Sequence, residues 1–247
     1  MENKKEKKLN GWKIWNVEIN TLLLPLGIIP AIFILYFIIG GYEKKINEKN
    51  TIFLFIAGIV AGIVIYIMEG MIFYQILTEA TYLDIIILFS FLFSFLDQLV
   101  KFAVVNMGRF KGEALPVYGA SFSCGISAVF APLLFGKSFE VSLSRLPLLL
   151  IPFAVMFFNC SAGILIGTGI KRNDKFKYFA WSLVAGMVIW IMVMTSIIYS
   201  MENNSISASI SVLSIILSFI ILYYAYNNIL PYGMLEKREL RKRYKNL

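Results

Sequence analysis

Three ionisable side chains and two cysteines interrupt long apolar stretches of the sequence, and their types limit the chemistry that the chain can perform. Glu69, Asp97 and Lys101 are the ionisable residues, and Cys124 and Cys160 are the only cysteines. A charge that faced lipid would cost ~2.5 to 3.5 kcal/mol, so we expect all three charged side chains to face protein or water. The chain contains no histidine, which removes both the commonest general base and the commonest metal ligand.

The elements that must position these residues are membrane-spanning helices. Of the 247 residues, 59% are hydrophobic and 15% are charged, a composition that excludes a water-soluble domain. The apolar runs repeatedly exceed the ~20 residues that a helix needs to cross the hydrocarbon core. We therefore predict an all-α polytopic integral membrane protein with about seven transmembrane helices in one bundle, over residues 21–40, 52–77, 82–107, 115–135, 146–170, 176–200 and 209–230.

The basic residues fall between and after these runs, which predicts both the domain organisation and the topology. A basic and aromatic interfacial segment (1–20) precedes the seven-helix domain (21–230), and a basic cytoplasmic tail (231–247) follows it. With the N-terminus outside, fifteen Lys and Arg lie on the inner side and seven on the outer side, so the positive-inside rule favours this orientation in the cell membrane. The net charge of +8 is thus assigned to loops that face anionic lipid, and a nucleic-acid partner is excluded.

Depth counting places several polar residues in one layer of the bundle. Asp97, Cys124 and Cys160 each lie nine or ten residues from the inner ends of their helices. At 1.5 Å rise per residue this is about 15 Å for all three. Gln98, Asn159 and Ser161 adjoin them in sequence and share the layer. Asp97 and Lys101 are four residues apart, so they face the same side of their helix and can form an ion pair.

Each member of this layer also has a structural interpretation. A cysteine inside a span is usually a small packing residue, and no disulfide framework is indicated. An intramembrane Asn or Ser usually bonds a neighbouring helix. Glu69 lies near the outer third of its helix, about 25 Å from Ile52 at helical rise, so a direct pair with Asp97 is not expected. It can also be a protonated acid bonded to a backbone carbonyl.

The order of several motifs resembles the PrsW and YhfC families of polytopic membrane proteases, which are related to the CAAX prenyl endopeptidase-like CPBP proteins. Segment 94–102 (Ser-Phe-Leu-Asp-Gln-Leu-Val-Lys-Phe) resembles the Glu-Glu-x-x-Lys helix of these proteases. Segment 112–125 resembles their Asp-Gly-x-x-Tyr-Gly-Ala helix, 159–162 their Cys-His-Ala stretch, and 68–71 the Glu-Gly element of YhfC-type proteins. The likeness extends over roughly residues 20 to 200 and implies the fold and a peptidase ancestry.

The departures from the family pattern fall on the residues that it uses for catalysis. The paired glutamates correspond to Asp97 and Gln98, a later glutamate to Phe130, and the histidines to Ser161 and Trp190. An amide cannot act as a general base, and a benzyl group cannot ligate zinc. Scaffold residues are retained: Lys101, Tyr118, Gly119, Gly125 and Gly167. The resemblance therefore implies a catalytically degenerate member.

Three classes of function follow as hypotheses. The leading one is an inactive protease-like protein that binds a membrane segment, a peptide or a lipidic ligand, or serves as a subunit of a membrane complex. Its candidate binding residues are Asp97, Lys101, Cys124, Asn159, Cys160 and Ser161. The first alternative is an active intramembrane protease with Asp97 as base and Glu69 or a cysteine as its partner. Its candidate catalytic residues are Asp97, Gln98, Lys101 and Glu69. The second is a transporter or channel component in which Glu69, Asp97 and Lys101 lie along a pathway. No cofactor is expected.

We predict that the purified protein carries no stoichiometric zinc. The chain lacks histidine, and the positions of the family's metal ligands hold Phe130, Ser161 and Trp190. Elemental analysis of the purified chain measures this directly. One zinc per chain that disappears in a Cys124→Ala variant would contradict the degenerate-protease interpretation.

Overall fold

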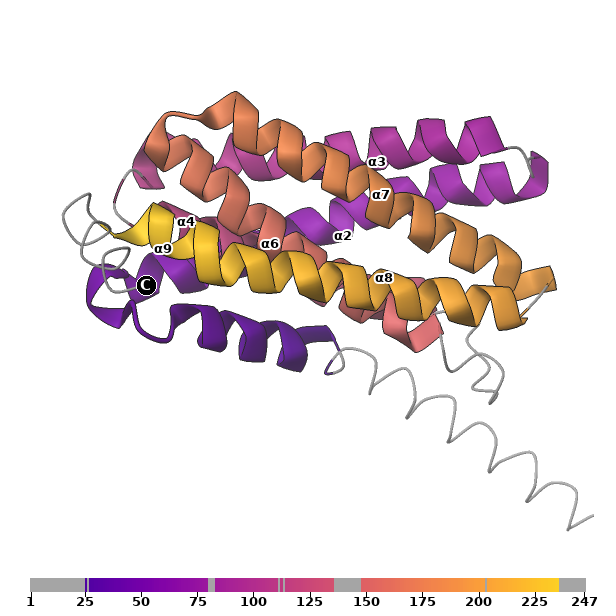
Figure 1. Cartoon of the computed structure of the whole chain (residues 1–247), viewed down its shortest axis with the longest axis horizontal. Helices are drawn as coiled ribbons and strands as arrows, with labels where there is room; N and C mark the ends of the chain where they lie inside the picture. Colours follow the sequence, from indigo (N-terminus) through magenta and orange to yellow (C-terminus); the bar gives the residue numbers. More distant parts are fainter. Residues whose placement is uncertain are drawn as a thin grey trace, which may run out of the picture.

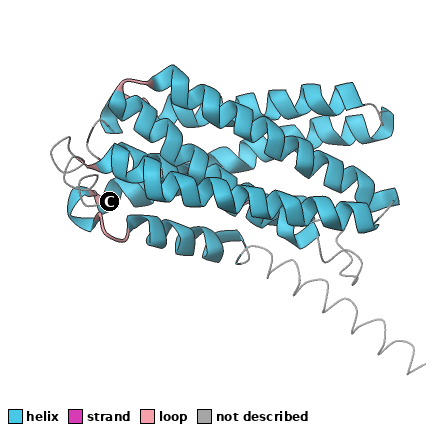
Figure 2. Cartoon of the chain, viewed as in Figure 1, coloured by secondary structure: helices cyan, strands magenta, loops and turns pink. Residues whose placement is uncertain are grey.

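The computed structural model describes residues 25, 27–79, 83–110, 112, 114–135, 148–202 and 204–235. Within these residues the chain is almost entirely helical, and the connecting turns are short (Figure 2). The predicted interfacial segment 1–20 and the tail from 236 onward lie outside the described residues. The predicted helical bundle is confirmed, with the helices lying roughly along one common direction (Figure 1).

Within the part of the chain that the structure describes, six helices are long and apolar enough to cross a membrane, so the protein is a multi-pass membrane protein. These spans are Glu48–Ile72, Leu83–Val105, Leu115–Leu134, Leu150–Arg172, Lys175–Ser200 and Ser205–Met234. The helices that form these spans are α2 (Glu48–Glu79), α3 (Leu83–Val105), α4 (Leu115–Ala128), α5 (Phe130–Phe135), α6 (Leu150–Arg172), α7 (Lys175–Glu202), α8 (Asn204–Tyr224) and α9 (Leu230–Met234), some of which extend a few residues beyond the span.

The predicted first span is described only in part, as an apolar helix over Gly27–Ile39. Its length of about 20 Å at helical rise is less than the ~30 Å hydrocarbon core. Ala31 and Ile38 are buried against the bundle, whereas Phe33 and Tyr36 are exposed. Gly41, with φ +90°, follows the helix in the left-handed region that ends many helices.

Two spans depart from a single straight helix. The fourth is interrupted at Val129, where α4 ends and the short α5 begins. The last contains a π-helical turn over Ala225–Ile229 before α9, and it continues to Met234, four residues beyond the predicted end at 230. Arg172 from the end of α6 donates hydrogen bonds to the carbonyl oxygens of Tyr232 and Leu235, which fixes this last turn.

The centre of the bundle is α4, which packs mainly against α6 on one side and α2 on the other. Every residue of α4 from Leu115 to Ala128 is buried, although the helix is only moderately apolar. The lipid-facing side chains come instead from the outer helices, for example Val60 on α2, Leu92 on α3, Val184 on α7 and Phe219 on α8. A short, small-residue helix is thus enclosed by longer apolar ones.

Glycines allow α4 to approach both neighbours closely. On α6, a Cβ added at Gly163 would clash with the carbonyl group of Gly119 on α4, and one added at Gly167 would clash with that of Leu115. On α2, a Cβ at Gly58 would clash with the backbone of Phe122. Gly163 and Gly167 form a G-x-x-x-G pair, a pattern that brings membrane helices into backbone contact.

A Gly163→Ala substitution is expected to destabilise the bundle by about 1–3 kcal/mol, because the added methyl group overpacks the contact between α6 and α4. Melting of the purified protein in detergent measures the loss. Gly70→Ala is the matched control, since a Cβ at Gly70 meets no atom within 4 Å. Equal melting temperatures for the two variants would show that the glycine contact does not limit packing.

Candidate functional site

A network of polar side chains crosses the interior of the bundle and is centred on Lys101 of α3. The Lys101 ammonium donates to Oδ1 of Asn159 on α6 at 2.5 Å and to Oε1 of Gln98 at 3.5 Å. Its Nζ lies 4.0 Å from Oδ2 of Asp97, one turn away on the same helix. The side chain of Lys101 is completely buried, so these three groups take the place of water around its charge.

The network extends from Lys101 to two further helices. Nδ2 of Asn159 donates to the hydroxyl oxygen of Tyr66 on α2 at 3.0 Å. Nε1 of Trp190 on α7 donates to Oδ2 of Asp97 at 3.4 Å. Side chains from α2, α3, α6 and α7 are therefore joined through one buried cation. The expected pairing of Asp97 with Lys101 is confirmed, and Asn159 provides the shorter contact.

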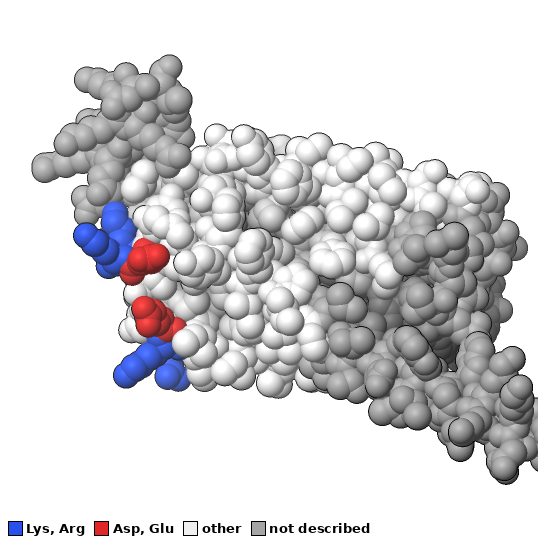
Figure 3. Space-filling model, turned by 90° about the horizontal axis from the view of Figure 1, so that it is seen from below, with Lys and Arg blue, Asp and Glu red and all other residues white. Residues whose placement is uncertain are grey.

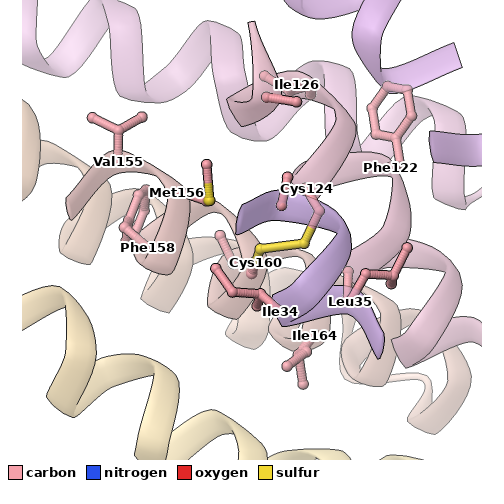
Figure 4. Close-up of a cluster of buried hydrophobic side chains, with 14 of the residues drawn as sticks. Ile34, Leu35, Phe122, Cys124, Ile126, Val155, Met156, Phe158, Cys160 and Ile164 are labelled. Carbon is pink, nitrogen blue, oxygen red and sulfur yellow. A yellow bond between two sulfur atoms is a disulfide. The ribbon is translucent and has the colours of Figure 1, made fainter. Parts of the chain in front are cut away.

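Cys124 and Cys160 form a disulfide that connects α4 to α6 (Figure 4). Their Cα atoms are 5.3 Å apart, and both residues are completely buried among apolar side chains. Depth counting correctly placed them in one layer, but the interpretation of each cysteine as an isolated packing residue is wrong. The pairing needs the close approach of α4 and α6 that Gly119 and Gly163 permit, a feature that the positions of the cysteines alone do not reveal.

Ser161 has a local role in the structure. Its hydroxyl group donates to the carbonyl oxygen of Phe158 in the preceding turn at 2.6 Å. It therefore makes no hydrogen bond to the Lys101 network, although it follows Asn159 closely in the sequence. Asp97, Gln98, Lys101 and Asn159 are brought together, whereas Ser161 bonds within α6 and the disulfide lies between α4 and α6.

Glu69 occupies a separate position at the edge of the polar interior. It is only 3% exposed, yet neither oxygen of its carboxyl group has a hydrogen-bond partner within the described chain. The hydrogen bond from a protonated Glu69 to a backbone carbonyl, one of our interpretations of the sequence, is thus not formed. Oδ1 of Asp97 and Nε2 of Gln98 also lack partners. Glu69 therefore makes no hydrogen bond to Asp97.

A cavity of about 210 Å³ lies beside Glu69. It is bounded by the later part of α2, the middle of α3, α5 and the second half of α7. Four aromatic side chains form much of its wall: Tyr66, Phe93, Phe130 and Trp190. Sequence reasoning had named Phe130 and Trp190 only as departures from a catalytic pattern, and it had missed Tyr66 and Phe93. Tyr66 precedes Glu69 by three residues, a spacing that places both on one helix face.

Phe130 and Trp190 pack against each other, and Trp190 connects this pair to Asp97. Their ring centroids are 6.0 Å apart, and Trp190 itself bonds to Asp97. Among the described residues, no group of three His, Cys, Asp or Glu side chains lies close enough to hold a metal ion. What the site offers chemically is one unpartnered carboxyl group, one ion pair and a set of aromatic surfaces.

We expect Lys101→Met to lower the free energy of unfolding by about 3–5 kcal/mol, because it leaves Asp97 as a buried acid without its cation. The double variant Asp97→Asn with Lys101→Met should recover part of this loss, since both charges are then removed. Melting temperatures in detergent provide the comparison. A double variant no more stable than Lys101→Met would show that the pair is not the source of the effect.

Comparison with known proteins finds no match: no family model, no curated protein and no solved structure matches the chain. The resemblance to the PrsW and YhfC families stays a prediction that depends on the quoted motifs.

Proposed function

We propose that this protein is a non-enzymatic membrane protein that binds a ligand in the cavity beside Glu69. The observation that carries the proposal is the carboxyl group of Glu69, which is buried and has no partner at either oxygen. Burying a polar group without a hydrogen bond costs free energy, and the cost is larger for a charge. A ligand with a complementary group would remove this cost and fill the cavity at the same time.

The same residues argue against peptidase chemistry. Gln98, at a position where the protease families have a glutamate, accepts a hydrogen bond from Lys101 and cannot act as a base. Phe130 and Trp190, at two further catalytic positions of the resemblance, contact each other through their rings. Asp97 is engaged by both Trp190 and Lys101. These contacts support a scaffold of the protease type that has been adapted to binding.

The structure favours a ligand in the cavity over a partner helix that binds the predicted polar layer. Asp97, Lys101, Cys124, Asn159, Cys160 and Ser161, which we predicted as binding residues, are all completely buried. A membrane helix that docked on the outside of the bundle would not contact them. A ligand at Glu69, by contrast, would meet a polar group and apolar walls together, as a lipidic molecule or a small amphipathic compound requires.

Charge distribution supports the predicted orientation. On the face shown in Figure 3, the coloured Lys, Arg, Asp and Glu side chains gather at one end of the bundle, and the surface along the helices is uncharged. Basic residues at the helix ends and short connections of the described chain include Lys44, Lys49, Arg109, Lys171 and Lys175. By the positive-inside rule this end would face the cytoplasm. Glu69 and the cavity would then lie in the outer half of the membrane.

The proposal is tested by blocking the cavity. Gly70 lines it, and a Cβ at this position meets no atom within 4 Å, so Gly70→Phe can fill the space without breaking the helix packing. We expect native mass spectrometry of the wild-type protein, purified from membranes, to detect a bound small molecule that Gly70→Phe lacks. Gly70→Ala is the matched control, and it should keep the bound molecule because its small side chain leaves the cavity open.

Two results would contradict this function. A ligand retained at full occupancy in Gly70→Phe would show that binding occurs elsewhere. A membrane substrate that the wild-type protein cleaves, and that Asp97→Asn leaves intact without a change in melting temperature, would favour the protease alternative.

A further inference from the structure

The buried charges of the described bundle do not balance. Its fully buried ionisable side chains are Glu69, Asp97 and Lys101, two acids and one base. Lys101 and Asp97 lie 4.0 Å apart and compensate each other. Glu69 is left without a cation of its own, although it is 97% buried and both its oxygens lack partners. Because an isolated carboxylate is costly in a low-dielectric interior, one further positive charge at Glu69 would be stabilised.

The wall of the cavity next to Glu69 is built from aromatic rings that meet at steep angles. Tyr66 and Phe130 pack at an interplanar angle of 62°, Phe130 and Trp190 at 83°, and Trp190 and Phe93 at 77°. The four rings thus form a continuous chain of edge-to-face contacts, and all four border the cavity. The faces of aromatic rings carry negative potential and attract cations, with tryptophan the strongest.

Hydrogen-bond acceptors are scarce on this wall. Among the described side chains that line the cavity, Glu69 is the only charged one. The hydroxyl oxygen of Tyr66 already accepts from Asn159, and the indole N–H of Trp190 already donates to Asp97. A primary ammonium would need acceptors for three N–H groups, and a metal ion such as Mg²⁺ or Ca²⁺ needs about six oxygen ligands. The wall provides neither set.

The size of the cavity fits a compact organic cation. Its volume of about 210 Å³ exceeds that of a single water molecule several-fold. It is also larger than an engineered protein cavity of ~150 Å³ that binds benzene, and smaller than the ~300 Å³ at which pockets for drug-sized ligands begin. A cationic group with a few methyl substituents is therefore of suitable size.

From these four observations we infer that the cavity is a binding site for a methylated ammonium group, a tertiary or quaternary amine, with Glu69 as its counter-ion and Tyr66, Phe93, Phe130 and Trp190 as its aromatic walls. This inference depends on the proposed function, because it names the ligand class of the same cavity. The ammonium group can belong to a free small molecule or to the headgroup of a lipid.

The first experiment uses the wild-type full chain in a maltoside detergent, which has no ammonium group. Thermal melting is followed against increasing tetramethylammonium chloride, with sodium chloride at equal ionic strength as the control. We expect a saturable rise in melting temperature with tetramethylammonium only. Choline should bind about tenfold more tightly than 3,3-dimethylbutan-1-ol, its uncharged isostere, because only choline carries the charge that Glu69 and the rings attract.

Substitutions then locate the site. Glu69→Gln keeps the shape of the side chain and removes its charge, and it should weaken tetramethylammonium binding by about tenfold. Phe130→Leu removes one aromatic wall and should weaken it several-fold. Asp84→Asn is the matched control: it removes one acidic charge from an exposed position on α3 and should leave the affinity unchanged. Phe130→Leu and the choline comparison keep the test decisive if Glu69→Gln fails to fold.

A comparison of membranes identifies the source of the group. In nanodiscs of phosphatidylcholine, a lipid headgroup that occupies the cavity would compete and weaken tetramethylammonium binding relative to nanodiscs of phosphatidylglycerol. Equal affinity in the two membranes would indicate a free amine, and both results agree with the inference.

Two outcomes would overturn it. The first is equal binding of choline and its uncharged isostere, which would make the cavity a purely apolar one. The second is the absence of any tetramethylammonium effect. If Gly70→Phe still abolishes a bound ligand in that case, the cavity binds a ligand of another class and the proposed function stands without this inference.

Discussion

A single buried cation sets the constraint that organises the interior of this bundle. Lys101 has no access to water, so its ammonium group must find acceptors within the protein, and it finds them on α3 and α6. Asn159 in turn donates a hydrogen bond to Tyr66 of α2, and Asp97 accepts one from Trp190 of α7. Four helices are thereby fixed relative to one another at the depth where lipid provides no hydrogen bonds.

The packing of α4 makes this arrangement possible. Without a hydrophobic driving force between helices in lipid, association depends on close contact, and the glycines of α2, α4 and α6 permit backbone contact on both faces of α4. The same contact brings Cys124 within disulfide distance of Cys160, next to Asn159 in the sequence. One turn of α6 is thus held at three residues: Asn159 by Lys101, Cys160 by the disulfide and Gly163 by the contact with α4.

The site differs from its surroundings because its charge is not balanced. Lys101 compensates Asp97, whereas Glu69 is excluded from the network and lines a cavity bounded by aromatic rings. The positions that a peptidase of the resembling families would use for catalysis hold Phe130 and Trp190, and these residues form the aromatic wall.

The sequence by itself determined the membrane class, the approximate helix bounds and the pairing of Asp97 with Lys101. Hydropathy and the spacing of four residues within one helix are local properties, so they can be read without knowledge of neighbouring helices. Only the tertiary structure decided that Asn159 is the closest partner of Lys101, that Cys124 and Cys160 are bonded, and that Glu69 remains unpartnered beside Tyr66 and Trp190. Lys101 and Asn159 are 58 positions apart, Cys124 and Cys160 are 36 apart, and Glu69 and Trp190 are 121 apart. Contacts over such separations depend on how the helices rotate and approach one another, which short apolar patterns do not specify.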